Sequence, residues 1–129
     1  MERREINTDR APAALGPYSQ AIVAGDLVFC SGTAGMDPAT GEVADGIAAQ
    51  TELALANLQA ILEEAGSSFE QLLKTTIMYS DVADFPVINE IYARHMPSPA
   101  PARSAPANVS LPRGLLISID AIAVLPPDR

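Results

Sequence analysis

The stretch GLLISIDAIAV, residues 114–124, decides the fold. In a β-strand, alternate side chains point to opposite faces. One face would carry Leu115, Ile117, Ile119, Ala121 and Ala123, which suits packing against helices. The other would carry Leu116, Ser118, Asp120, Ile122 and Val124, and it is too apolar to be left in water. The pattern therefore predicts a strand covered by helices on one face and by another subunit on the other.

Residues 46–65 predict a long helix that supplies this cover. Apolar and small residues recur there at three- and four-residue steps, on one stripe: Ile47, Thr51, Ala54, Leu55, Leu58, Ile61, Leu62 and Ala65. The polar side chains of Glu52, Gln59, Glu63 and Glu64 lie off the stripe. Gly66 follows as the stop signal.

The remaining segments predict further strands and a second helix, without strict alternation of the two. Two apolar runs about Gly25-Asp26 predict a hairpin over 21–32, and residues 72–80 predict a further strand. Residues 81–96 predict a second helix, with Asp84 as N-cap and Pro86 in its first turn. Residues 102–110 and 114–124 predict two strands, and both chain ends are expected to be exposed. The order β-β-α-β-α-β-β favours an α+β fold with the helices on one face of the sheet.

Composition narrows the class of protein. A chain of 129 residues with 48% hydrophobic residues suits one folded domain over residues 1–129. A formal net charge of -8 with no basic run argues against nucleic acid as a partner. One cysteine, Cys30, and one histidine, His95, make an internal disulfide impossible and a structural metal site improbable. No apolar run has membrane-spanning length and no signal peptide is visible, so we expect a cytoplasmic protein without a membrane partner.

Arg103 is the first candidate for chemistry. It stands in PARSAP, residues 101–106, among small residues with proline on either side. A guanidinium can hold a carboxylate in a planar, two-pronged pair. The alternative interpretation is a salt bridge at the surface or at an interface.

Seven segments together resemble the reactive-intermediate deaminase family, also called RidA, YjgF or L-PSP endoribonuclease. They are APAALGPYSQA (11–21), FCSGT (29–33), DPATGEV (37–43), AQTELALANLQAILEEAG (49–66), INEIY (88–92), PARS (101–104) and IDAIAV (119–124). The resemblance implies a two-layer, chorismate-mutase-like fold. It also implies a homotrimer with a central β-barrel and three clefts between subunits. The implied activity is that of a hydrolase acting on C–N bonds, a 2-iminobutanoate/2-iminopropanoate deaminase. Such an enzyme converts 2-imino acids to 2-keto acids and ammonia without a cofactor.

The resemblance also carries over a set of site residues. Arg103 falls on the family's carboxylate-binding arginine. Other substrate-binding positions fall on Tyr18, Ser31, Gly32, Asn89 and Ala105. Taken alone, several of these have plainer interpretations: Tyr18 suits an interface aromatic, Ser31 a strand end and Asn89 a solvated helix position.

Two positions depart from the family pattern. Ala105, followed by Pro106, stands where the family often has cysteine. Ser118 stands where the family has the glutamate that orients or activates the hydrolytic water, so Arg103 and Ser118 become the candidate catalytic pair. A serine hydroxyl can hydrogen-bond a water but is a poor general base without help. Asp120 lies on the same face of the predicted strand, about 7 Å further along.

Four functions therefore stay open. The first is an imine deaminase that detoxifies products of pyridoxal-phosphate dehydratases. The second is a non-catalytic trimer that binds small carboxylates such as 2-keto acids. The third is a deaminase for a pathway-specific imine. The fourth, a ribonuclease, fits poorly with the acidic charge and the lack of clustered His or Lys.

Overall fold

The computed structural model describes residues 1–127. The strands are β1 (Arg3–Ile6), β2 (Ala21–Ala24), β3 (Leu27–Ala34), β4 (Leu72–Tyr79), β5 (Ala102–Ser104) and β6 (Ile117–Val124). The helices are α1 (Gly46–Ala65) and α2 (Phe85–His95), with short 3-10 turns η1 (Phe69–Gln71), η2 (Val82–Asp84) and η3 (Pro112–Gly114). No helix within residues 1–127 is long and apolar enough to cross a membrane.

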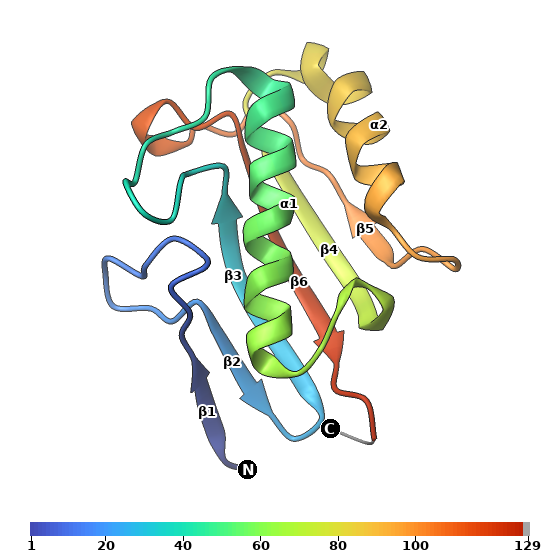
Figure 1. Ribbon diagram of the computed structural model, residues 1–129. Helices are drawn as coiled ribbons and strands as arrows, with labels where there is room; N and C mark the ends of the chain where they lie inside the picture. Colours follow the sequence, from blue (N-terminus) through green and yellow to red (C-terminus); the bar gives the residue numbers. More distant parts are fainter. Residues whose placement is uncertain (128–129) are drawn as a thin grey trace.

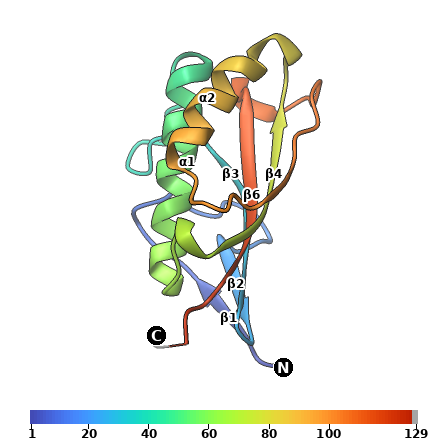
Figure 2. The same cartoon turned by 90° about the vertical axis from the view of Figure 1, so that its right-hand side faces the viewer.

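The strands form one mixed sheet in the order β1-β2-β3-β6-β4-β5. Every neighbouring pair is antiparallel except β4 and β5, which run parallel and are joined through α2. Both helices lie on the same face of this sheet, with α1 over β3 and β6 (Figures 1 and 2). The α+β prediction, with helices on one face, is confirmed.

The helix predicted over 46–65 is present with the same bounds. Its stripe faces the sheet: Leu55, Leu58 and Leu62 are completely or almost completely buried, while the four predicted polar positions are exposed. Gly66 ends the helix in the left-handed conformation, with φ 91°, and its N–H bonds to carbonyls of the last turn. Periodicity alone therefore placed this element correctly.

The two faces of β6 differ as predicted. Ile117, Ile119, Ala121 and Ala123 are all at most 2% exposed under the helices. On the opposite face of the sheet, no helix or other segment within residues 1–127 covers the strands (Figure 2). Large apolar side chains stay exposed in the two flanking strands: Phe29 is 42% exposed on β3 and Leu73 47% on β4.

One strand was missed and one predicted strand ends early. The N-terminal residues 1–5 are exposed, as expected, but β1 also pairs along its whole length with β2. The strand predicted over 102–110 stops at Ser104, since Pro106 has no N–H for a ladder and Asn108 takes a positive φ of 62°. Asp84 is the N-cap residue of α2 and Pro86 lies in the first turn, as predicted, but the Asp84 side chain makes no capping bond. Asp81 instead accepts from the N–H of Ala83 at the start of η2.

Candidate functional site

A cavity of about 290 Å³ opens where β3 and β6 meet the loops before and after them. Four of the predicted site residues line it: Tyr18, Ser31, Gly32 and Ser118. Much of the rest is apolar, including Met36, Ile61 and Leu115. Polar groups on one side of the cavity and apolar side chains on the rest suit a small organic ligand with one polar end.

A β-bulge in β3 positions Ser31 and Gly32 at the cavity. Cys30 pairs with Ala121 and Thr33 with Ile119, so Ser31 and Gly32 together stand opposite Asp120. A Cβ added to Gly32 would come within 2.7 Å of the Ser118 Oγ. Glycine is therefore needed at 32 for the serine hydroxyl to lie against the bulge.

The buried side-chain amide of Gln20 anchors the loop that carries Tyr18. The side chain of Gln20 is tied to the backbone at four points: it accepts from the N–H of Thr8 and donates to the carbonyls of Thr8, Ala11 and Pro12. The Ser31 hydroxyl donates to the carbonyl of Ser19 at 2.6 Å, joining the same loop to the bulge. Tyr18 itself is 54% exposed, so its ring is available at the mouth of the cavity.

Ser118 has an uncommitted hydroxyl. The residue is only 8% exposed, yet its Oγ makes no hydrogen bond to any residue within 1–127. Arg113, on η3, is the only charged residue among those that line the cavity, and no carboxylate is among them. Asp120 does not line the cavity, although it lies two residues along β6 from Ser118. The hydroxyl can therefore bind a water or a ligand, but no acid residue is in place to assist it within the cavity.

Arg103 belongs to a second group of side chains, on the face of β5 that α2 covers. Its Nη1 donates to Asn89 Oδ1 at 2.8 Å. Its guanidinium carbon lies 5.0 Å from the ring centroid of Tyr92 and 5.4 Å from that of Phe85. Arg103 makes no ion pair with a residue in the described chain. The cation is thus positioned by uncharged groups and keeps further N–H donors for an anion.

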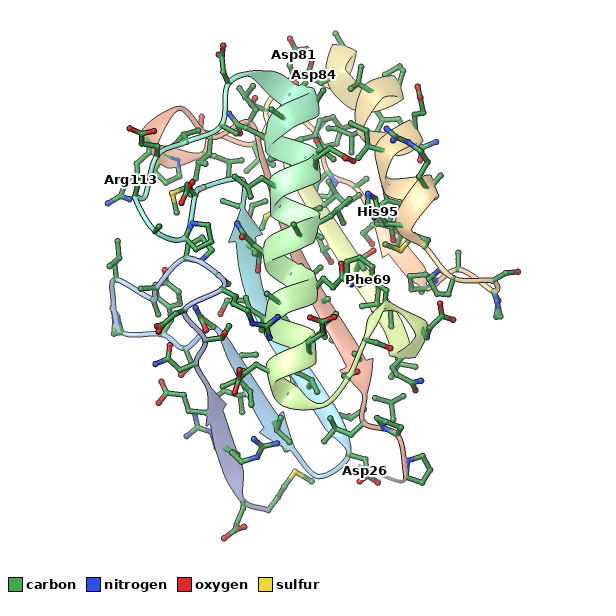
Figure 3. All side chains as sticks on the ribbon, in the orientation of Figure 1. Asp26, Phe69, Asp81, Asp84, His95 and Arg113 are labelled. Carbon is green, nitrogen blue, oxygen red and sulfur yellow. The ribbon has the colours of Figure 1, made fainter. Side chains whose placement is uncertain are left out.

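The structure does not bring Arg103 and Ser118 together in one chain. Arg103 on β5 pairs with Thr75 of β4, and Ser118 on β6 pairs with Met78 of β4. Strand β4 therefore lies between Arg103 and Ser118. By strand geometry they are separated by about 10 Å across the sheet and about 10 Å along it. In Figure 3, Arg113, which lines the cavity, and His95, at the end of α2, lie on opposite sides of α1. Ala105, just after β5, lies partly buried against the core and lines no cavity with Ser118.

Cys30 and His95 stay outside both groups. Burial, with a smaller contribution from the nearby Asp120 charge, raises the pKa of Cys30 to about 12, so it is a neutral thiol at physiological pH. His95 ends α2, where Nε2 lies 3.2 Å from Glu52 Oε1 and the ring meets Phe69 edge-on (Figure 3). Neither is placed to take part in chemistry at the cavity.

Sequence reasoning named Asn89 but missed the other residues that support the two groups. Phe85 lies four residues before Asn89 and Tyr92 three residues after it, which puts all three on one face of α2 toward Arg103. Gln50 and Asn57 are buried amides on α1 that bond the backbone at Ala44, Gly114 and Leu116, and at Ala34 and Met36. Two amides seven residues apart on an apolar stripe were the signal available in the sequence.

Known proteins resemble the chain closely. The family model described as endoribonuclease L-PSP matches residues 8–125. The chain is 47% identical to the chloroplastic Reactive Intermediate Deaminase A of Arabidopsis thaliana over 126 residues, covering 97% of this chain and 67% of the relative. It is 43% identical to a human protein named 2-iminobutanoate/2-iminopropanoate deaminase, covering 97% and 92%.

A solved structure agrees with this grouping. The crystal structure of E. coli TdcF with bound serine superposes with a TM-score of 0.90 at 38% identity, covering 95% of this chain and 99% of that one. The family model, the sequence relatives and the shared fold all point the same way. The chain therefore belongs to the reactive-intermediate deaminase (RidA, or L-PSP) family.

Proposed function

We propose that this protein hydrolyses 2-imino acids to 2-keto acids and ammonia without a cofactor. One observation carries the proposal. The Arg103 guanidinium is oriented by an amide oxygen and two aromatic rings, yet it forms no ion pair with a carboxylate within residues 1–127. A 2-imino acid presents an α-carboxylate beside its C=N bond. Relatives named 2-iminobutanoate deaminases and a neighbour crystallised with serine support a ligand of this kind.

The chemistry asks little of the protein beyond positioning. Water adds to the imine carbon and one of its protons passes to the nitrogen, which gives a carbinolamine. The new hydroxyl then gives up its proton to the nitrogen as the C–N bond breaks, which leaves a keto group and ammonia. The protonated imine is already electrophilic, so holding it beside a water lowers the barrier without a strong base. Arg103 would anchor the carboxylate, and the free Ser118 hydroxyl would hold the water. β-Elimination from serine or threonine by pyridoxal-phosphate dehydratases supplies imines of this class.

The distance between the two groups requires a second copy of the chain. We propose a homotrimer in which Arg103 and Asn89 of one copy complete the cavity lined by Tyr18, Ser31, Gly32 and Ser118 of the next. The uncovered sheet face supports this assembly, because Phe29, Ile122 and Val124 would be removed from water there.

A coupled assay tests the activity. A threonine dehydratase generates 2-iminobutyrate in place, and formation of 2-ketobutyrate is followed with and without the protein. We expect the protein to raise the rate above the spontaneous one, in proportion to its concentration. The same result with a heat-denatured sample would show that the acceleration does not come from the folded site.

The absence of a carboxylate from the cavity lining favours one alternative, a trimer that binds 2-keto acids without turning over imines. Calorimetric titration with 2-ketobutyrate separates the two. Binding together with acceleration supports the deaminase, and binding without acceleration supports the alternative. Neither binding nor acceleration would contradict both.

A further inference from the structure

The side chain of Tyr92, which contacts Arg103, is fixed in place by a buried hydrogen bond. Its side chain is 4% exposed, and its phenol oxygen lies 2.7 Å from the Thr75 Oγ1. Thr75 is fully buried on β4. This is a short hydrogen bond between two side chains that the hydrophobic core surrounds, so it has no competition from water.

The bond closes a ring of contacts around the guanidinium. Thr75 is the residue that pairs with Arg103 in the β4–β5 ladder. Its hydroxyl fixes the Tyr92 ring, and that ring lies under the Arg103 guanidinium at 5.0 Å. One turn earlier on α2, Asn89 fixes the direction of Nη1. The strand that sets the Arg103 backbone therefore also sets the surface on which its side chain rests.

Phe85 adds a second aromatic ring to this support. Its ring lies 5.4 Å from the guanidinium carbon and tilts against the buried Tyr79, with 5.7 Å between ring centroids. A flexible arginine side chain loses entropy when a ligand orders it, so prior ordering strengthens binding. Two rings and one amide oxygen order this arginine before any ligand arrives.

We propose that Tyr92, fixed by its hydrogen bond to Thr75, is a positioning residue that holds Arg103 ready for the carboxylate of the substrate. This rests on the proposed function of Arg103 and goes beyond it. Tyr92 touches no reacting atom, and its effect passes entirely through the guanidinium.

The test is the paired change Thr75→Val with Tyr92→Phe. It keeps both shapes and the aromatic ring, and it removes both polar partners together, so that neither is left unsatisfied in the core. Calorimetry with 2-ketobutyrate is expected to show a Kd about threefold to tenfold higher, with KM for 2-iminobutyrate rising by a similar factor and kcat changing less than about twofold. Ile88→Val, at a fully buried position of α2 outside this ring of contacts, is the structural control.

A double-mutant cycle identifies the route of the effect. In an Arg103→Lys background, which loses the planar fork, the paired change should alter Kd by less than about twofold. An equal factor in both backgrounds would overturn the proposal, as would an equal rise in Kd from Ile88→Val. An unchanged Kd in the paired variant, with binding lost in Arg103→Ala, would refute the role of Tyr92 and leave the proposed function standing. Unchanged binding in Arg103→Ala would instead contradict the proposed function.

Discussion

Replacing Arg103 with alanine is expected to lower kcat/KM for 2-iminobutyrate by at least about a hundredfold, which corresponds to about 3 kcal/mol. The guanidinium makes the only charge-assisted contact that we assign to the substrate carboxylate. Its removal leaves that carboxylate without a partner and the imine carbon without a fixed position. The coupled dehydratase assay measures the change directly.

Arg94→Ala is the matched control for this experiment. Arg94 lies on the same helix as Asn89, is exposed, and forms no ion pair within residues 1–127. Its loss changes the net charge by the same amount, and we expect it to alter kcat/KM by less than about twofold. If the two alanine variants behave alike, Arg103 does not bind the substrate.

Replacing Gly35 with alanine is expected to destabilise the fold by about 3 kcal/mol or more. Gly35 is buried just after β3, where its backbone packs directly on that of α1. An added Cβ would clash with the carbonyl oxygen of Gln50 and lie 2.6 Å from its Cα. Backbone cannot rotate away as a side chain can, so the strand and the helix must move apart.

Chemical denaturation measures this loss, with Gly16→Ala as the control. A Cβ on Gly16 would meet only the Tyr18 ring, at an ordinary 3.6 Å, so we expect a change within about 0.5 kcal/mol. Because Asn57 bonds the carbonyls of Ala34 and Met36 on either side of Gly35, separation there should also disturb the cavity. Equal stability of the two variants would show that the sheet and α1 are not tightly packed at this point.

Much of the fold could be predicted because its signals are local. The stripe of α1, the two-residue connection at Gly25-Asp26 and the alternation along β6 each depend on neighbours in the sequence. The missed strand β1 has a polar sequence, RREI, and forms only because β2 offers it a partner. The chain beyond Ser104 leaves the sheet, and it bonds Tyr79 through the carbonyl of Pro106 and the N–H of Val109. Such pairings are tertiary and leave no periodic pattern.

The candidate site residues could be named from the sequence, but their arrangement in space could not. The family resemblance supplied Tyr18, Ser31, Gly32, Arg103 and Ser118 by position in the sequence. That Arg103 lies two strands away from Ser118 follows from the strand order β6-β4-β5, which brings together segments far apart in the chain. The support of Arg103 by Tyr92 and Thr75 likewise depends on the parallel register of β4 and β5. Neither relation can be read from one sequence.

Subunit complementation tests the central claim that the site is shared between copies. Arg103→Ala disables one half, and Gly32→Val, which pushes a branched side chain onto Ser118, disables the other. The two inactive variants are unfolded, mixed in equal amounts and refolded, and the coupled assay is repeated. Random association in a closed ring should restore about a quarter of the wild-type activity, because that share of clefts receives both intact halves. Mixed assemblies of the correct size with no recovered activity would contradict a site built from two copies.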